Sequence, residues 1–219
     1  MGFLIKIKNK ELEEIGIFLD IAIDNIIEGN IIGFPTNSMY RLGCDPTNIG
    51  AVERLYQLKF RDKSKGFLLL VADFEEAKKI AEFNEIALKL ASHFWPGQLI
   101  LKLNRKQPNI IPIEVSASEK NIRLNIPENK IISEILKSLK EKGTFGGIVG
   151  TSASYSGEDP ATSGQEVSNR FLGPIDLILD AGESESKDAS TIVDCTKNQI
   201  EILREGNISK EEILKVISD

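Results

Sequence analysis

Short apolar runs that alternate with amphipathic stretches limit the fold of this chain more than any other feature does. Residues 67–71 are apolar without interruption, which is typical of a strand buried on both faces. Residues 11–28 carry apolar side chains at helical spacing and are followed by Gly29, a residue type that often ends a helix. Because both patterns recur along the chain, the sequence predicts a mixed α/β protein with a mostly buried sheet flanked by helices.

The same patterns locate the remaining elements. Predicted strands cover residues 3–7, 31–34, 67–71, 99–103, 121–126, 147–150, 175–179, 191–194 and 200–203. Predicted helices cover residues 11–28, 48–58, 74–94, 130–142, 165–172 and 210–217. We expect residues 151–164 and 182–189 to be polar loops. Since neither an internal repeat nor a low-complexity linker interrupts this series, we expect a single domain over residues 1–219.

Histidine and cysteine usage excludes several classes of site. His93 is the only histidine, so His-based metal cages and Cys/His zinc sites cannot form within one chain. A catalytic triad would have to use this residue, which ends a predicted helix and is expected to cap or pack there. Cys44 and Cys195 lie far apart in sequence, which favours neither a disulfide framework nor a thiol metal motif. We expect a protein of the reducing cytoplasm.

The charge balance also limits the partners of the chain. The formal net charge is −6, so the surface as a whole does not attract polyanions, and a phosphate site must be a local basic cluster. No apolar run approaches the roughly 20 residues that span a bilayer, so we expect no membrane partner. Residues 59–66 supply a local reversal of sign, because Lys59, Arg61, Lys63 and Lys65 lie within seven residues.

This basic segment can be interpreted in two ways. It suits a polyphosphate, because arginine binds phosphate with two parallel hydrogen bonds and lysine adds point charges. It is equally typical of a solvated charged loop. On either interpretation we expect Lys59 and Arg61 to lie in a polar loop, so that replacing them would leave the fold nearly intact.

Three further segments place polar residues at the ends of predicted strands. Residues 34–40 follow a buried strand, where open α/β sheets commonly bind ligands. Residues 150–157 are rich in glycine and hydroxyls and could cradle an anion, although they match neither a P-loop, a dinucleotide-binding fingerprint nor a nucleophile elbow. Arg123, residues 189–194 and residues 203–206 form the last group. A capped turn, a flexible loop and strand-edge ion pairs, respectively, are the structural alternatives.

The order of several short motifs is more specific than any one of them. Along the chain stand Pro-Thr-x-Ser-x-Tyr, Lys-x-Arg, Phe-Trp-Pro-Gly, Arg-x-x-x-Pro, Thr-Ser-Ala-x-x-Ser-Gly, Ser-Thr-Ile-Val-Asp and Arg-Glu-Gly. In these motifs, from about residue 29 to residue 206, the chain resembles the YrdC-like family. The resemblance implies a single YrdC-like domain, with a twisted α/β sheet and a positively charged concave groove.

The resemblance also implies an activity. Members act as L-threonylcarbamoyladenylate synthase, a nucleotidyltransferase that converts L-threonine, bicarbonate or CO2, and ATP into threonylcarbamoyl-AMP and pyrophosphate. The product passes to the machinery that makes threonylcarbamoyl-adenosine in tRNA. ATP is then a substrate, and Mg²⁺ is expected to be carried by ATP with few ligands from the protein.

The matched motifs imply roles for individual residues. Lys59 and Arg61 would be catalytic, and Thr36, Tyr40 and Arg123 would form the threonine site. The implied ATP-binding residues are Lys59, Arg61, Lys65, Ser152, Ser154, Ser190 and Arg204. No metal-ligating residue is implied. The chemistry needs no histidine, because a threonine carbamate already has a nucleophilic oxygen and the protein must mainly position it and stabilise charge at the α-phosphate.

The chain departs from the family pattern at several of these motifs. Asn37 replaces an acidic residue, Arg41 the glycine of Tyr-Gly-Leu, and Ser154 the asparagine of Ser-Ala-Asn; Asp62 and the pair Gly66-Phe67 replace a proline and a Pro-Leu pair. A threonine pocket of the family type requires Arg41 to point away from it.

These departures keep alternatives open. One is a divergent YciO-like paralogue, or a carbamoyl-adenylate enzyme that uses another acceptor, as in the hydrogenase-maturation relatives. Another is a non-catalytic module that binds tRNA or double-stranded RNA. The negative net charge and the aromatic content of 6% weigh against the RNA module.

Overall fold

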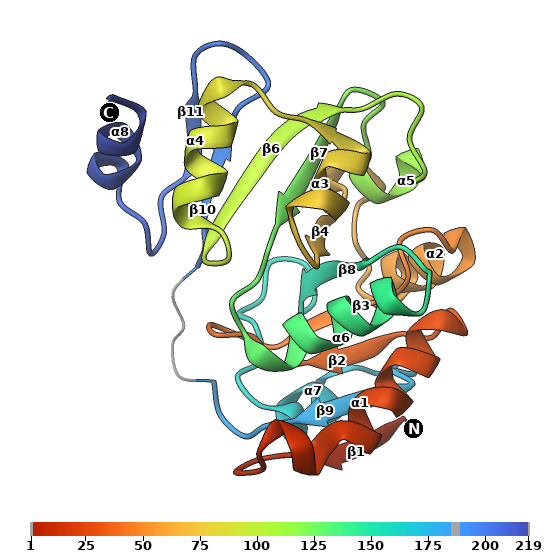
Figure 1. The fold of residues 1–219 in the computed structure, drawn as a ribbon. Helices are drawn as coiled ribbons and strands as arrows, with labels where there is room; N and C mark the ends of the chain where they lie inside the picture. The colour runs from red at the N-terminus through yellow and green to blue at the C-terminus, as the bar shows by residue number, and fades with distance from the viewer. Residues whose placement is uncertain (1, 185–188, 219) are drawn as a thin grey trace.

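The computed structural model describes residues 2–184 and 189–218, and a mixed 11-stranded sheet forms its frame (Figure 1). The strands are β1 (Phe3–Lys6), β2 (Ile32–Phe34), β3 (Arg41–Gly43), β4 (Leu68–Val71), β5 (Ala81–Glu82), β6 (Leu99–Arg105), β7 (Asn121–Asn125), β8 (Gly147–Ser152), β9 (Leu177–Asp180), β10 (Thr191–Asp194) and β11 (Glu201–Arg204). Their order across the sheet is β1-β9-β2-β3-β8-β4-β7-β6-β10-β11, and β5 pairs with β6. The predicted mixed α/β class is confirmed.

Helices cover both faces of this sheet. They are α1 (Leu12–Ile27), α2 (Ile49–Leu58), the 3-10 turn η1 (Lys63–Lys65), α3 (Phe74–Ile80), α4 (Glu85–Phe94), α5 (Ile113–Ser116), α6 (Lys130–Glu141), α7 (Gly164–Arg170) and α8 (Lys210–Ser218). Helices α1 and α6 lie side by side on one face (Figure 1), whereas α2, α3, α4 and α7 bury their apolar residues in a second cluster on the other face.

The sequence pattern explains this two-sided burial. In β4 the side chains alternate, so that Leu68 and Leu70 join the cluster beneath α1 and α6 while Leu69 and Val71 join the opposite one. Helix α6 buries Ile132, Ile135, Leu136 and Leu139 along one stripe. A strand that supplies two cores must be apolar throughout, and this is why the apolar run at residues 67–71 predicted a buried strand.

Strand β8 joins the two halves of the sheet. It pairs antiparallel with β3 through Arg41 and Ser152, and antiparallel with β4 through Leu68 and Gly150. On the far side of β3, Arg41 is paired with Phe34 of β2. The hydroxyl-rich segment after β8 therefore lies next to the turn between β2 and β3.

The predicted helix over residues 74–94 is wrong. The chain leaves α3 at Ala81, pairs with β6 as the short β5, and starts α4 after Asn84, whose side chain accepts a hydrogen bond from the Ala87 amide. Apolar spacing continues across this break, so periodicity alone did not reveal it. The structure also contains β3, η1 and α5, which the sequence patterns did not predict, and β8 extends two residues into the predicted 151–164 loop. The predicted 182–189 loop lies partly outside the described residues.

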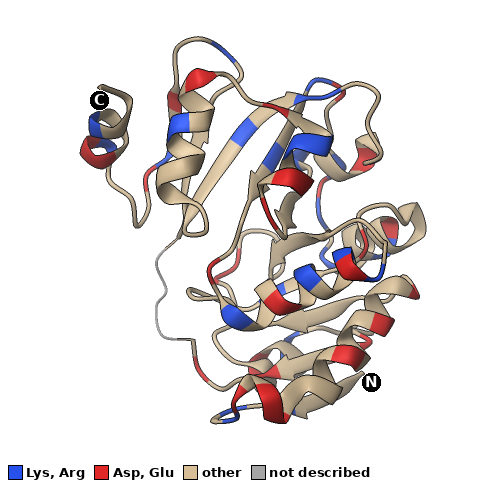
Figure 2. Cartoon of the chain, viewed as in Figure 1, with Lys and Arg blue, Asp and Glu red and all other residues tan. Residues whose placement is uncertain are grey.

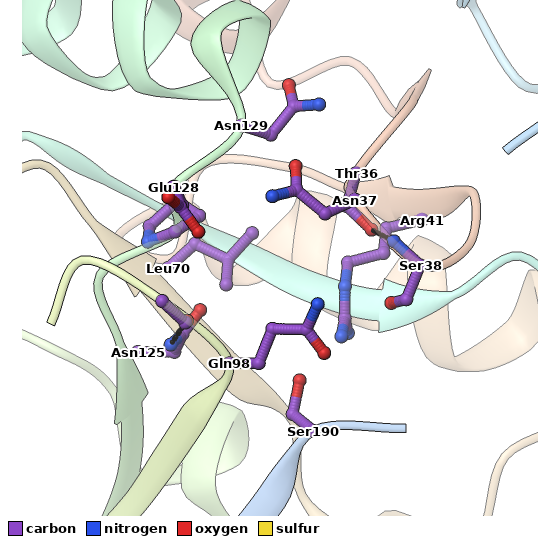
Figure 3. Close-up of a pocket in the computed structure, with 12 residues that line it drawn as sticks. Thr36, Asn37, Ser38, Arg41, Leu70, Gln98, Asn125, Glu128, Asn129 and Ser190 are labelled. Atoms are coloured by element: carbon purple, nitrogen blue, oxygen red, sulfur yellow. Dashed lines mark hydrogen bonds between the residues drawn. The ribbon is translucent and has the colours of Figure 1, made fainter. Parts of the chain in front are cut away.

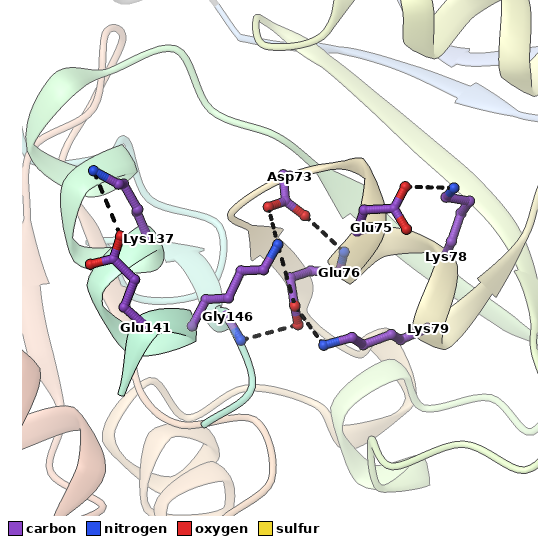
Figure 4. Close-up of polar contacts among 9 residues, drawn as sticks. Asp73, Glu75, Glu76, Lys78, Lys79, Lys137, Glu141 and Gly146 are labelled. Atoms are coloured by element: carbon purple, nitrogen blue, oxygen red, sulfur yellow. Dashed lines mark hydrogen bonds and ion pairs between the residues drawn. The ribbon is translucent and has the colours of Figure 1, made fainter. Parts of the chain in front are cut away.

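An ion-pair network connects helices from the two faces (Figure 4). The fully buried carboxylate of Glu76 in α3 pairs with Lys79 at 2.6 Å and with Lys140 of α6 at 3.9 Å, and accepts a hydrogen bond from the Gly146 amide at 3.2 Å. Lys140 also pairs with Asp73. The network fixes the chain where it enters β8.

None of the helices in residues 2–184 and 189–218 combines the length and apolar character needed to cross a membrane.

Candidate functional site

Five arginine and lysine side chains from four separate segments lie close enough for their charges to act on one another. Lys59 ends α2, Arg61 follows it, Arg41 belongs to β3, Arg123 to β7 and Arg204 to β11. Each has a lowered pKa: burial is the main cause, and neighbouring cations of the group add to it for Lys59, Arg41 and Arg123. By contrast, every charged residue of the outer helix α1 is acidic (Figure 2). Helix α1 thus carries only negative charge, whereas the five cations belong to other elements.

Lys59 lies deeper than expected. Its side chain is 1% exposed, and its ammonium donates hydrogen bonds to the carbonyl oxygens of Ser152 and Ser154. Burial lowers its pKa to about 7, with further lowering by Arg61 and Arg41. The expectation of a cation in a polar loop is wrong for Lys59, because this C-terminal residue of α2 points its stem into the core and its ammonium under the Ser152–Ser154 turn.

Arg61 closes the loop that follows. Its Nε and Nη2 atoms both donate to the Gly66 carbonyl oxygen, at 3.0 and 2.7 Å, and its guanidinium lies 5.2 Å from the centre of the Phe67 ring. Gly66 has a φ of +55°, and a Cβ there would lie 2.3 Å from the Ser116 carbonyl oxygen. Glycine is therefore required where the family pattern has proline.

The other two lysines of the segment are exposed. Lys63 pairs with Glu53, whereas the backbone carbonyl of Lys65 accepts a hydrogen bond from the Arg123 guanidinium. Lys65 and Arg123 line one depression together with Lys102 and Ser116. Lys65, implied for ATP, and Arg123, implied for threonine, are therefore neighbours in the structure.

The implied nucleotide residues form two pairs. The hydroxyl oxygens of Ser152 and Ser154 lie 3.0 Å apart, and the backbone carbonyl oxygens of the same two residues accept hydrogen bonds from the Lys59 ammonium. The Arg204 Nε and Nη2 atoms donate to the Ser190 carbonyl oxygen at 3.0 and 2.8 Å. Arg204 therefore orders the backbone at Ser190, a buried residue, and its charge acts on Arg41 and Arg123.

Thr36 and Ser190 line a separate pocket (Figure 3). The Thr36 hydroxyl donates to the Met39 carbonyl oxygen at 2.6 Å, which shapes the turn between β2 and β3. The other lining residues include Ser38, Arg41 and Gln98. The pocket is small: it has a volume of about 30 Å³, room for about two water molecules.

The profile of the Sua5/YciO/YrdC family, described as telomere recombination, matches residues 24–206. The chain belongs to the Sua5/YciO/YrdC family. The resemblance inferred from the motifs is therefore confirmed.

Individual relatives of this family refine the comparison. A threonylcarbamoyl-AMP synthase of Pyrococcus abyssi is 32% identical over 91% of the chain, which spans 57% of that protein. The structure of P. abyssi Sua5 complexed with L-threonine has a TM-score of 0.87 and 30% identity over 99% of the chain and 61% of Sua5. Escherichia coli YciO, with a TM-score of 0.78 and 24% identity over 94% of the chain and 96% of YciO, shares the fold.

Arg41 lies differently from the expectation drawn for a Sua5/YciO/YrdC member, whereas Tyr40 and Thr36 line a second pocket together. Arg41 was expected to point away from the Thr36 pocket, yet it lines it (Figure 3). Tyr40 and Leu42 are buried in the cluster with α2, so Arg41 between them projects to the opposite face, where Leu70 lies. Tyr40 does not line this pocket.

Tyr40 instead anchors the backbone of this family member beside the pocket. Its hydroxyl donates to the Gly182 carbonyl oxygen at 2.8 Å and accepts from the Ala181 amide at 2.9 Å. Burial raises its pKa, and Asp180 at 3.3 Å adds to the effect. The ring is fully buried, and these contacts hold the start of β3 against the end of β9. Tyr40 thereby stabilises the backbone next to the turn that contains Thr36.

Some lining residues were missed from sequence. Gln98 directly follows the Phe-Trp-Pro-Gly motif and Asn125 lies inside Arg-x-x-x-Pro, but neither residue was singled out. His93 is exposed at the last turn of α4, and the Cys195 thiol is buried, which raises its pKa to about 12. In the described part of the chain neither side chain lines the pocket.

Proposed function

We propose that this chain is a nucleotidyltransferase that forms threonylcarbamoyl-AMP and pyrophosphate from L-threonine, bicarbonate or CO2, and ATP, for the threonylcarbamoyl-adenosine modification of tRNA. The observation that carries the proposal is a group of five cationic side chains, Lys59, Arg61, Arg41, Arg123 and Arg204, that lie close enough for their charges to act on one another in a protein of net charge −6. The identity to a threonylcarbamoyl-AMP synthase over 91% of the chain supports it. Cytoplasmic location and transfer of the product to the tRNA-modifying machinery remain predictions.

The proposed reaction is a displacement at the α-phosphorus of ATP. A carbamate oxygen of carboxylated threonine forms a bond to this phosphorus, and the bond from the phosphorus to the bridging oxygen of pyrophosphate breaks. Negative charge grows on the leaving pyrophosphate, and we expect Arg61 and the Lys65 and Arg123 side chains, which line one depression, to stabilise it. Lys59 contributes its charge from below the Ser152–Ser154 turn, and Arg204 holds the backbone at Ser190.

Magnesium belongs to the substrate in this proposal. In residues 2–184 and 189–218 no three His, Cys, Asp or Glu side chains lie together as a possible metal site. Mg²⁺ prefers phosphate oxygens and water, so we expect it to arrive with ATP and to need few protein ligands.

The test measures pyrophosphate release with and without threonine and bicarbonate. We expect release to need both, and Arg61→Ala to lower it roughly 10²- to 10³-fold, the usual cost of removing one such charge contact. Lys63→Ala is the matched control, because it removes one positive charge from the same loop where Lys63 pairs with Glu53, and we expect near-normal release. Melting temperatures of both variants report whether the loop still folds.

Two results would overturn the proposal. One is threonine-independent pyrophosphate release, which would indicate another acceptor, as in a divergent paralogue. The other is tight, steeply salt-dependent binding of RNA without any ATP turnover, which would indicate an RNA-binding module.

A further inference from the structure

Three charged side chains form a row across the sheet. They are Asp194 of β10, Lys102 of β6 and Arg123 of β7, which are register partners on neighbouring strands (Figure 1). The residues that precede and follow each of them in sequence are buried in the cluster with α2, so the three charged side chains project from the opposite face of the sheet. A carboxylate, an ammonium and a guanidinium therefore follow one another on this face.

The stability of the sheet does not explain why a lysine stands in this row. Lys102 is the one charged residue in the apolar run 99–103. Its side chain is 30% exposed and pairs at 2.7 Å with Asp194, whose side chain is 13% exposed. An ion pair that is partly removed from water loses hydration and gives little net stability, so two apolar residues would serve the sheet as well.

The depression beside this row suits an anion with several negative charges. It has a volume of about 360 Å³, within the range of small-molecule sites. Lys65, Lys102 and Arg123 line it, together with uncharged hydrogen-bonding residues such as Ser64 and Asn121. Among the described residues that line it, none carries a carboxylate. Three cations in such a space match linked phosphate groups better than a single carboxylate.

Asp194 is the counter-ion of Lys102 in the structure, but it does not line the depression. Its Oδ2 atom accepts a hydrogen bond from the Lys102 ammonium, whereas Oδ1 accepts from the Thr196 amide and hydroxyl at 2.9 and 2.6 Å. Thr196 therefore continues to satisfy one carboxylate oxygen if Lys102 turns away. The flexible four-carbon stem of lysine permits this movement, and a phosphate ligand attracts the ammonium more strongly than one carboxylate does.

We propose that Lys102 binds a phosphate group of the pyrophosphate product as the third cation of this depression, and that pyrophosphate displaces Asp194 from the Lys102 ammonium. The assignment rests on the proposed function, because that reaction releases pyrophosphate. Lys102 lies outside every motif that carries the family resemblance. Since Lys102 and Arg123 are directly opposite each other on neighbouring strands, they can contact different phosphate groups of one pyrophosphate.

The first test removes the Lys102 charge. Calorimetry without ATP, at fixed ionic strength, measures the affinity of the full chain for inorganic pyrophosphate and for orthophosphate. We expect Lys102→Met to weaken pyrophosphate binding roughly 10-fold, the value of one charge-assisted contact, and orthophosphate binding by less than about threefold. Lys102→Arg keeps the charge and should bind pyrophosphate within about threefold of the wild type.

The second test removes the competing carboxylate. Asp194→Asn keeps the side-chain oxygen that Thr196 contacts but loses the negative charge that attracts Lys102. We expect this variant to bind pyrophosphate about threefold more tightly than the wild type. In the double variant with Lys102→Met the gain should disappear, because Asp194 acts through Lys102. A purely structural role of Asp194 would instead weaken binding in both backgrounds.

A matched variant controls for the loss of one positive charge. Lys106 follows β6, is exposed and does not line the depression, so Lys106→Met should bind pyrophosphate within about twofold of the wild type. Circular dichroism and melting temperature check the fold, and Lys102→Gln provides a second neutral variant. Equal affinities in Lys102→Met and Lys106→Met, weaker binding by folded Asp194→Asn, or no pyrophosphate binding by the wild type would each overturn the assignment.

Failure of the proposed function gives a different result. If pyrophosphate binding depends on Lys102 but pyrophosphate release does not depend on threonine, the reaction proposed above is wrong and the Lys102 assignment stands. If release needs threonine and bicarbonate but Lys102→Met binds pyrophosphate like the wild type, the reaction stands and the Lys102 assignment is overturned.

Discussion

At the scale of single residues, the buried amine of Lys59 is expected to couple proton uptake to ATP binding. Its ammonium is buried, donates hydrogen bonds to two backbone carbonyl oxygens, and is close enough to Arg61 and Arg41 for their charges to act on it. With a pKa of about 7 against a usual 10.5, most Lys59 side chains are neutral at pH 8. A nearby triphosphate favours the charged amine and raises this pKa again.

We therefore expect ATP binding to take up close to one proton at pH 8, and ATP affinity to fall as the pH rises above about 7. The sign follows because the bound state holds the proton that the free state has lost. Calorimetric titrations in buffers of different ionisation enthalpy measure the uptake directly.

Two variants separate Lys59 from its neighbours in this experiment. Lys59→Met removes the titrating amine and should abolish the proton uptake. Lys65→Met removes an exposed cation of the same segment and should leave the uptake in place. Equal uptake in wild type and Lys59→Met would contradict the assignment to Lys59.

At the scale of elements, Asn84 decides where α4 begins and what it contacts. Its side-chain oxygen Oδ1 accepts a hydrogen bond from the Ala87 backbone amide at 2.8 Å. Its side-chain nitrogen Nδ2 donates hydrogen bonds to the backbone carbonyl oxygens of Cys195 and Lys197 at 2.9 and 3.1 Å. One side chain thus caps α4 and attaches it to the turn after β10.

Asn84→Ala should lower the free energy of unfolding by about 2 kcal/mol, the sum of a lost cap and the lost bonds to carbonyl oxygens. Asn48→Ala is the matched control, since Asn48 caps α2 by the same bond, to Ala51 at 3.0 Å; its loss should cost about 1 kcal/mol. Urea denaturation measures both. Equal losses would show that the attachment to β10 is energetically neutral.

The elements that sequence predicted are those whose pattern coincides with their burial. Strand β4 and helix α6 satisfy this condition, because their apolar positions are their buried positions. Strand β3 has only three residues, Arg41 to Gly43, and an arginine among them, so no periodicity could be detected. The same reason explains the wrong prediction for Lys59. The sequence places this residue directly after α2, but it does not reveal that its side chain points into the core rather than into solvent.

At the scale of the whole molecule, the Glu76 network holds helices of the two faces together. Lys140 belongs to α6, beneath one face, and Glu76 to α3, on the other. The Gly146 amide completes the contact just before β8. The strand that borders the site is thus fixed at its start by Glu76 and near its end by Lys59.

Removing the Glu76 carboxylate should destabilise the molecule by about 1–3 kcal/mol, because the buried Gly146 amide loses its acceptor. Glu76→Gln keeps an acceptor and should cost less than Glu76→Ala. Glu75→Ala is the matched control: Glu75 pairs with Lys78 on the exposed surface, and its loss should change stability by less than about 0.5 kcal/mol. Thermal and urea unfolding test this order, and equal losses for Glu75 and Glu76 would refute it.

The separation of the Arg41 pocket from the Lys65–Arg123 depression bears on how such proteins diverge. The two are lined by different residues: the first takes its wall from the short turn between β2 and β3, whereas the second is built on η1 and β7. A duplicated copy of this chain could exchange a few residues near Thr36 and Arg41 while the Lys65–Arg123 depression stayed as inherited. Within such a lineage, the pocket and the depression can evolve at different rates.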